Sequence, residues 1–135
     1  MSNALYDYGR QRYLQGQFNW LTDNVQCFLV DTTVYSVNLA VHQYLSDVST
    51  SAMLTSPVTL TGKATAAGAA SAANVTFSAV TGNTAEAIIL FVNTGTPATS
   101  PLICYIDTAT GLPITPNGGD IIVTWDTGVN KIFKL

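Results

Sequence analysis

Short apolar runs fill the C-terminal half of the chain, and turn-forming residues separate them. The runs are EAIILFVN (86–93), LICYID (102–107), LPIT (112–115), DIIVTW (120–125) and KIFKL (131–135). Between them lie TGTPATSP, TATG, PNGG and DTGVN, which are rich in Gly, Pro, Thr and Asn. Apolar, β-branched runs bounded by such residues are typical of strands joined by tight turns. The pattern therefore predicts an antiparallel meander over this half.

Alternation within these runs also predicts which side chains are buried. Successive side chains of a strand point to opposite faces, so alternate residues share an environment. In DIIVTW this places Ile121, Val123 and Trp125 on one face. The predicted contributors to the core are Ile89, Phe91, Ile103, Tyr105, Ile121, Val123 and Trp125.

The central part of the chain has a weaker pattern. VQCFLV (25–30) predicts a buried strand, and VTLTG (58–62) and NVTFSAV (74–80) predict strands of alternating Thr and apolar residues. NLAVHQYLSDV (38–48) indicates a short helix or turn with Asn38 as its N-cap. The Ala/Gly/Ser run from Ala64 to Ala73 fits a mobile loop, a helix broken by Gly68 or a flat strand, and we favour the loop.

Residues 1–20 form a segment of different character. Leu5, Tyr8, Arg12 and Tyr13 recur at helical spacing, and Ser2 or Asn3 is a suitable N-cap. The predicted organisation is thus a helical, aromatic arm over 1–20 and a single β-domain over 21–135. We expect a mainly β protein, an antiparallel β-sandwich of jelly-roll-like type that carries a short N-terminal helical arm.

The chain is poor in charge for its length. Of its 135 residues, 47% are hydrophobic and only 10% are charged, against about 25% charged in an average soluble domain. Between Val48 and Ile106 the charged residues are Lys63 and Glu86. Such a surface suits a subunit packed against copies or partners. The alternative is a neutral, Thr-rich β-domain without an obligate partner.

Charge and hydropathy also argue against several classes of protein. A net charge of −3, with only Arg10 and Arg12 close together, does not favour nucleic-acid binding. The sequence lacks a run of 18 apolar residues, so we expect no transmembrane helix. The N-terminus lacks the apolar stretch of a signal peptide, so we expect synthesis in the cytoplasm with Cys27 and Cys104 as reduced thiols.

Candidate chemistry is sparse. Asp107, Asp120 and Asp126 lie around the Gly-rich C-terminal turns but lack the spacing of a calcium loop. His42 is the single histidine, and neither a phosphate-binding glycine motif nor a paired carboxylate is present. We therefore predict no catalytic residues, no metal and no cofactor, which argues against an enzyme.

Several motifs carry a resemblance to a known family. They are NALYDYGRQRYLQGQFNW, VNLAVHQYLSDV, TFSAVTGNTAEAIILF, YIDTATGLPITPNGGDIIVTWDTG and NKIFKL. In them, and over its full length, the chain resembles a family of small virion proteins of tailed bacteriophages. The resemblance implies a particle component, most plausibly one displayed on the capsid shell, and it implies no catalytic residues.

Two hypotheses follow from these observations. The first is a capsid decoration (cement) protein, located in the virion and assembled in the host cytoplasm. Its predicted partners are further copies of itself and the major capsid protein or other virion proteins; a tail or head-to-tail component is a near alternative. The second is a glycan- or small-ligand-binding β-module, which requires a pocket lined by Trp20, Tyr35, Tyr44 or Trp125.

The arm provides the predicted interface, because aromatic side chains are favoured where an interface must be large and rigid. The alternative is that the arm packs as a lid on its own domain. The residues predicted to contact a neighbour are Tyr6, Tyr8, Tyr13, Phe18 and Trp20.

Overall fold

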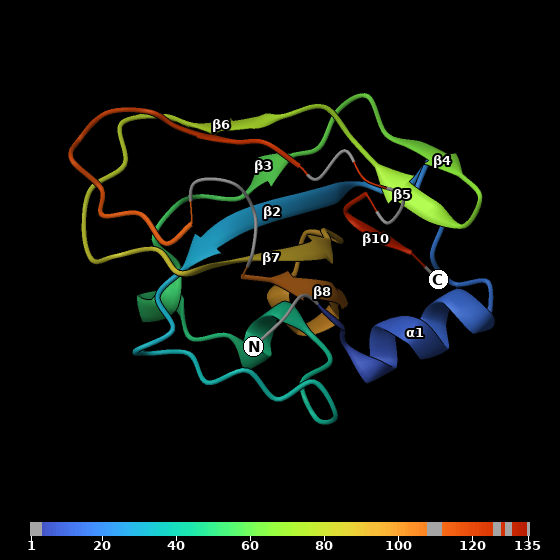
Figure 1. The fold of residues 1–135 in the computed structure, drawn as a ribbon. Coiled ribbons are helices and arrows are strands. Elements are labelled where there is room, and N and C mark those ends of the chain that lie inside the picture. Colours follow the sequence, from blue (N-terminus) through green and yellow to red (C-terminus); the bar gives the residue numbers. More distant parts are fainter. Residues whose placement is uncertain (1–3, 108–111, 126–127, 129–130, 135) are drawn as a thin grey trace.

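The computed structural model describes residues 4–107, 112–125, 128 and 131–134 (Figure 1). These residues form short strands, one α-helix near the N-terminus and three 3₁₀ turns. The elements are β1 (Ala4–Leu5), α1 (Asp7–Leu14), β2 (Val25–Val30), η1 (Leu45–Asp47), η2 (Thr50–Ala52), β3 (Val58–Thr59), β4 (Ala64–Ala66), β5 (Ala69–Ser71), β6 (Val75–Phe77), β7 (Ala87–Val92), η3 (Pro97–Thr99), β8 (Leu102–Ile106), β9 (Ile121–Val123) and β10 (Phe133–Lys134).

A five-stranded antiparallel sheet lies at the centre, in the order β1-β8-β7-β2-β3. Its middle strands are the most apolar runs of the sequence, and β2 pairs with β7 over six residues, from Val25↔Val92 to Val30↔Ala87. The smaller sheets have the orders β10-β5-β4 and β6-β9. The prediction of a mainly β, antiparallel protein with a short helix near its N-terminus is confirmed.

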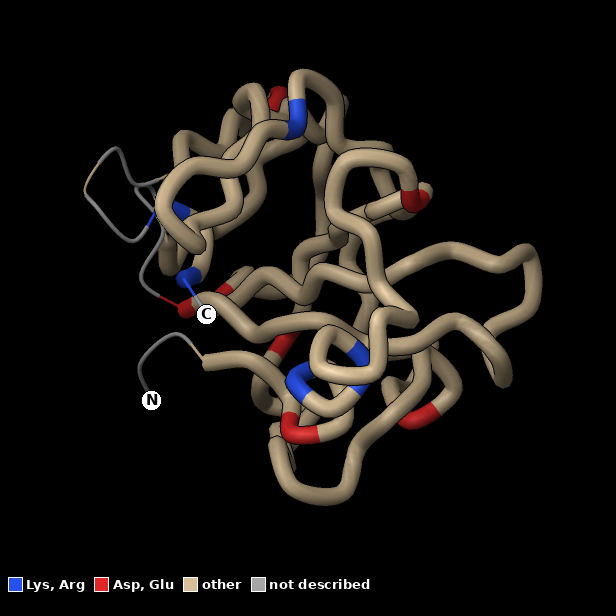
Figure 2. The backbone as a smooth tube through the Cα atoms, turned by 90° about the vertical axis from the view of Figure 1, so that its right-hand side faces the viewer, with Lys and Arg blue, Asp and Glu red and all other residues tan. Residues whose placement is uncertain are grey.

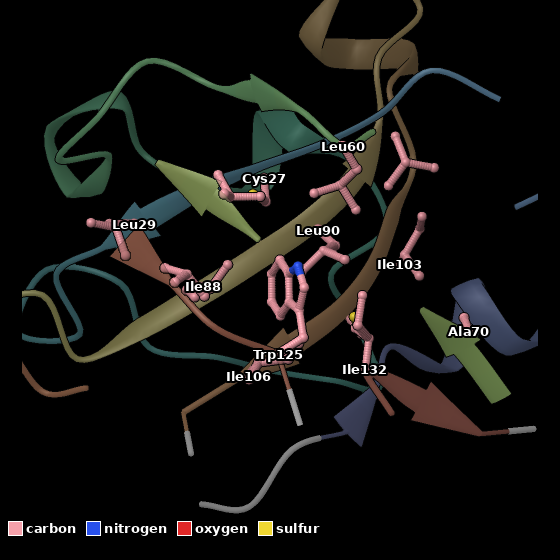
Figure 3. Close-up of a cluster of buried hydrophobic side chains, with 14 of the residues drawn as sticks. Cys27, Leu29, Leu60, Ala70, Ile88, Leu90, Ile103, Ile106, Trp125 and Ile132 are labelled. Carbon is pink, nitrogen blue, oxygen red and sulfur yellow. The ribbon is translucent and has the colours of Figure 1, made fainter. Parts of the chain in front are cut away.

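Both faces of the central sheet are buried, which explains why its middle strands are apolar at nearly every position. We call the cluster between this sheet and the smaller sheets the upper cluster, after its position in Figure 1, and Figure 3 shows part of it. It includes Val25, Cys27, Leu29, Ile88, Leu90, Ile103, Ile121, Val123, Trp125 and Ile132. The lower cluster, on the opposite face, includes Tyr6, Phe28, Val30, Tyr35, Val48, Ala52, Ile89, Phe91, Leu102 and Tyr105.

All seven predicted core residues are buried, but they do not share one core. Ile89, Phe91 and Tyr105 belong to the lower cluster, whereas the other four belong to the upper cluster. Alternation separates the two sets correctly in β7. Alternation alone does not show that both faces of the central sheet are covered by other parts of the chain.

A bulge in β8 positions the N-terminal arm. Leu90 pairs with Cys104 and Phe91 with Leu102, so Ile103 is an additional residue in β8. The carbonyl of Ile103 accepts a hydrogen bond from Tyr6 N at 3.0 Å, just before α1 begins. A Cβ on Gly9 would lie 2.9 Å from that same oxygen, so helix α1 approaches the bulge as closely as it does only because residue 9 is glycine.

The predicted C-terminal meander is wrong beyond its first hairpin. β7 and β8 are neighbours, but β9 pairs with β6 and β10 pairs with β5. LPIT forms a single bridge, Ala85↔Ile114, rather than a strand. Alternation identifies a strand without specifying its partner, and here the partners come from distant parts of the chain. The predicted turn TATG, and Asp126, Thr127, Val129 and Asn130 of DTGVN, lie outside the described residues.

The Ala-rich run is a hairpin, so the favoured loop interpretation is wrong and the strand alternative is closer. β4 and β5 pair from Ala64↔Ser71 to Ala66↔Ala69. The connecting residues Ala67 and Gly68 have φ values of 51° and 82°, as a two-residue type I′ hairpin turn requires. Trp20 Nε1 donates to the carbonyl of Ser71 at 3.0 Å, which holds β5 against the upper cluster. The composition of the Ala-rich run could not predict this hydrogen bond, because its donor, Trp20, lies far away in the sequence.

The N-terminal segment begins with a strand. Ala4–Leu5 pairs with Cys104 and Tyr105 of β8 before α1 starts at Asp7, with Tyr6 as its N-cap. The predicted caps Ser2 and Asn3 lie outside the described residues. Farther along, Asn38 accepts a hydrogen bond from Ala40 N in a turn, and the only helical residues of the 38–48 segment are the 3₁₀ turn η1.

Candidate interaction site

The aromatic residues of the arm pack mostly on their own chain. Tyr6, Phe18 and Trp20 are buried, whereas Tyr8 and Tyr13 are half-buried. The Tyr13 ring lies 4.9 Å from that of Phe18, and Trp20 lies 5.3 Å from Phe133 of β10 (centroid distances). This arrangement agrees with the lid alternative. That the same five residues also contact a neighbouring subunit stays a prediction.

A groove with an exposed apolar wall lies on the outer side of the arm, between α1 and β10. Its volume is about 340 Å³, and we call it the arm groove. Leu14 in its wall is 90% exposed, the highest value among the large hydrophobic residues that the structure describes. Its lining residues are Leu5, Arg10, Tyr13, Leu14 and Lys134.

Two cations line the arm groove beside its apolar surface. Arg10 forms an exposed ion pair with Asp7 of the same helix at 3.3 Å, whereas Lys134 forms no ion pair within the described residues. Among the described residues, Lys134 is therefore the groove cation without an acidic partner. The helical spacing in the sequence indicated Leu5 and Tyr13, but it did not identify Leu14 or Lys134 as exposed residues of a groove. The available signal was the apolar Leu14 in the otherwise polar stretch at the end of the helix.

A buried chain of hydrogen bonds connects the arm to the segment that covers the lower face of the sheet. Tyr6 Oη lies 2.8 Å from Tyr35 Oη, which in turn lies 2.8 Å from Nδ1 of His42. The backbone N–H of Asn38 also donates to this Nδ1. Burial raises the pKa of Tyr35 to about 12 and that of Tyr6 further still. The single histidine is thus packed within a structural network.

The aromatic residues required by the ligand-binding alternative do not converge on one pocket. Trp20 and Trp125 belong to the upper cluster, and Tyr35 belongs to the lower cluster on the other side of the sheet. Tyr44 is half-buried, with its hydroxyl 2.9 Å from Arg12 and its ring 4.9 Å from the guanidinium carbon. A second groove, of about 380 Å³, lies between residues 54–58 and 76–81, and none of these four aromatic residues lines it.

Two of the described carboxylates, Asp31 and Asp120, accept hydrogen bonds from backbone N–H groups of turns or loops. Asp31 is buried and accepts hydrogen bonds from the Thr33 hydroxyl, Asn83 and the Thr33 backbone, which lower the pKa of its carboxyl. Asp120 accepts from Ala79 N at 3.0 Å. Among the described residues no three His, Cys, Asp or Glu side chains lie where they could share a metal ion. Asp126, one of the three sequence candidates, lies outside that part of the chain.

Both cysteines are free, buried thiols. Cys27 in β2 and Cys104 in β8 pair with the same residue, Leu90 of the intervening strand β7. Two strand spacings separate them, about 9.6 Å, whereas a disulfide needs Cα atoms within about 7 Å. Burial raises the pKa of Cys27 to about 12, so neither a disulfide nor a reactive thiolate is expected at this site.

Charged residues are few and scattered over the described surface, as Figure 2 shows. Several of them lie on or beside helix α1, next to the arm groove, which Arg10 and Lys134 line. None of the described helices is long and apolar enough to cross a membrane. Comparison with known proteins adds no assignment, since no family model matches the chain and no curated protein gives a significant match.

Proposed function

We propose that this protein is a structural component of a bacteriophage virion, a decoration (cement) protein that binds and stabilises the assembled head. The observation that supports a docking role most directly is the arm groove, where Leu14 is exposed beside the cation Lys134. The virion assignment itself rests on the resemblance of the sequence motifs. We also propose that the protein performs no chemistry and that its working form is a homo-oligomer.

The groove favours a partner segment that presents an apolar side chain next to a carboxylate. Burial of an exposed Leu side chain contributes about 1.5–3 kcal/mol, and Lys134 is placed to pair with the acid. The segment from Val48 to Ile106 carries only Lys63 and Glu86 as charged residues, so its surface can lie on another protein without leaving many buried ions unpaired. Since one cation dominates, we expect attachment to depend only weakly on salt.

A cement protein can act with modest affinity at each site. A ligand that binds only the assembled state stabilises it by about 2.7 kcal/mol per site at a hundredfold excess over Kd. Many copies on one shell multiply this contribution. The buried clusters on both faces of the central sheet support such a role, because they favour a domain that stays folded while it is bound to the shell.

We further infer that the central sheet and the smaller sheets form a sandwich of the predicted jelly-roll-like type. The upper cluster supports this inference, since residues of β5, β6 and β9 pack there against β2, β7 and β8. The arm would then be part of this domain rather than a separate unit, because Leu5, Phe18 and Trp20 join the same cluster. The proposed location is the virion.

The test uses shells assembled without this protein. Purified protein is added back, its occupancy is measured by sedimentation, and thermal release of the packaged genome reports shell integrity. We expect the wild type to bind and to raise the release temperature. Leu14→Glu should weaken binding about 10- to 100-fold, as loss of one buried Leu implies. Leu21→Glu is the matched control, because Leu21 is 53% exposed and does not line the groove.

Three results separate the alternatives. Binding to isolated tails but not to shells would favour the tail or head-to-tail component. Binding to neither would overturn the structural role. Equal shell binding by Leu14→Glu and the wild type would leave the decoration role standing but reject the arm groove as its docking site.

A further inference from the structure

Strand β4 forms an open edge of the three-stranded sheet β10-β5-β4. Within the described residues β5 is its one strand partner, and all three of its residues, Ala64, Thr65 and Ala66, are exposed. Figure 1 shows β4 on the outer side of the β4–β5 hairpin, at the periphery of the molecule. An exposed strand edge presents unpaired backbone groups that can accept another strand.

The hydrogen-bond register shows which groups face this open edge. Ala66 and Ala69 flank the two-residue turn, so they form a hydrogen-bonded pair, and in an antiparallel ladder the next pair, Thr65↔Ala70, is not hydrogen-bonded. The bond from Ile132 N to the carbonyl of Ala70, at 3.0 Å, supports this, since Ala70 directs its backbone toward β10. The N–H and C=O of Thr65 therefore point away from β5, into the open edge.

Of the usual devices that protect such an edge, β4 has only its short length of three residues. Natural edge strands carry lysines, prolines or bulges that prevent pairing with another chain. β4 has the sequence Ala-Thr-Ala and pairs with β5 without a bulge. The nearest charge, Lys63, donates a hydrogen bond from its ammonium group to the backbone carbonyl of Asp23. This bond keeps the lysine side chain on its own chain.

We infer that β4 pairs with the β4 strand of a second copy of this chain, antiparallel and around a two-fold axis at Thr65. Each Thr65 N–H then donates to the Thr65 carbonyl of the other copy, and the two three-stranded sheets join into one. The interface is self-complementary, as a two-fold contact requires. Thr65 lies opposite Thr65, a favourable cross-strand pair, and Ala64 lies opposite Ala66 without meeting a like charge.

A second copy is favoured over a foreign strand because every contact in this arrangement is satisfied by residues of β4 itself. The contact is short, so we expect weak, concentration-dependent association in solution, with Kd on the order of 0.1–1 mM. Dense display of copies on a surface would strengthen it through high local concentration. This self-association requires neither the arm groove nor the virion assignment, and it can be tested in solution.

Proline at residue 65 provides the sharpest test. Thr65→Pro removes only the outward N–H, which edge strands tolerate, and should leave the β4–β5 hairpin intact. We expect sedimentation equilibrium of the full chain to show a monomer–dimer equilibrium for the wild type and for Thr65→Val, which keeps the N–H. Thr65→Pro should weaken self-association at least tenfold, and Thr65→Lys should do the same by charge repulsion. Unchanged circular dichroism would show that both variants fold.

Amide exchange keeps the inference testable even if the proline variant fails to fold. The Thr65 amide of the wild type should exchange more slowly as protein concentration rises, while the amide of Thr76, an exposed residue of β6, should not. A wild-type protein that stays monomeric up to about 1 mM, with a Thr65 amide insensitive to concentration, would overturn the inference. Dimerisation that survives in both Thr65→Pro and Thr65→Lys would overturn it as well.

Discussion

Trp125 donates its indole Nε1–H to the backbone carbonyl of Ala73 at 3.0 Å, which ties the end of β9 to the chain that leaves β5. The ring is buried in the upper cluster (Figure 3). Trp125→Ala should lower the free energy of unfolding by about 3–5 kcal/mol, through the cavity and the lost bond. Urea denaturation followed by circular dichroism measures this loss.

The control for Trp125 lies on the adjoining strand. Ile122 of β9 is 61% exposed, so Ile122→Ala should change the free energy of unfolding by no more than about 0.5 kcal/mol. A loss of less than about 1 kcal/mol for Trp125→Ala would show that the indole does not help hold the layers together.

Gly9→Ala tests the close approach of α1 to the bulge in β8. Alanine normally stabilises a helix by about 1 kcal/mol relative to glycine. Here the new Cβ would lie 2.9 Å from the carbonyl oxygen of Ile103 and 3.1 Å from that of Leu102, and backbone atoms cannot move aside cheaply. We therefore expect a net loss of about 1–3 kcal/mol, measured by thermal unfolding. Gln11→Ala, at an exposed position of the same helix, should not destabilise, and a stabilised Gly9→Ala would contradict the contact.

Tyr35→Phe tests the hydrogen-bond chain between the arm and His42. Removal of the central hydroxyl leaves Tyr6 Oη without its partner in a fully buried position. An unsatisfied buried polar group costs about 1–3 kcal/mol, so the free energy of unfolding should fall by that amount. Tyr8→Phe is the control, because the half-buried Tyr8 hydroxyl makes no hydrogen bond within the described residues. Equal stability of the two variants would show that water replaces the Tyr35 hydroxyl.

Stability should decline at alkaline pH. Burial raises the pKa of both Cys27 and Tyr35 to about 12, and it also raises the pKa of Cys104 and Tyr6. In the unfolded chain these groups titrate near about 8.5 for Cys and 10 for Tyr. The unfolded state therefore loses protons first, and the stabilisation is fully present below pH 8 and is lost as pH rises through the folded pKa values.

The expected slope is up to about 1.4 kcal/mol per pH unit for each group that titrates only in the unfolded state. Urea midpoints measured from pH 7 to pH 11 should fall from about pH 9 onward. Cys104→Ala should reduce the decline near pH 9, although it is less stable throughout. A midpoint that stays constant to pH 11 would show that these groups are accessible to hydroxide in the native state.

The local elements and the low charge of the surface could be predicted from the order of the residues alone. Apolar runs bounded by turn residues located β2, β7, β8 and β9, because strand alternation and turn chemistry depend on neighbouring residues. The same local information identified the seven buried core positions. Composition showed how few charges the surface carries, which is a property of the chain before it folds.

How these elements combine depends on contacts between distant parts of the chain, which the sequence pattern does not reveal. The pairing of β9 with β6 and of β10 with β5 joins segments far apart in the sequence, and alternation is the same for any partner. The Ala-rich run became a hairpin because bonds from distant residues, such as Trp20, hold it in place. The exposure of Leu14, the burial of Tyr6 and the open edge at Thr65 were likewise decided by packing, since burial depends on what covers a side chain rather than on its type.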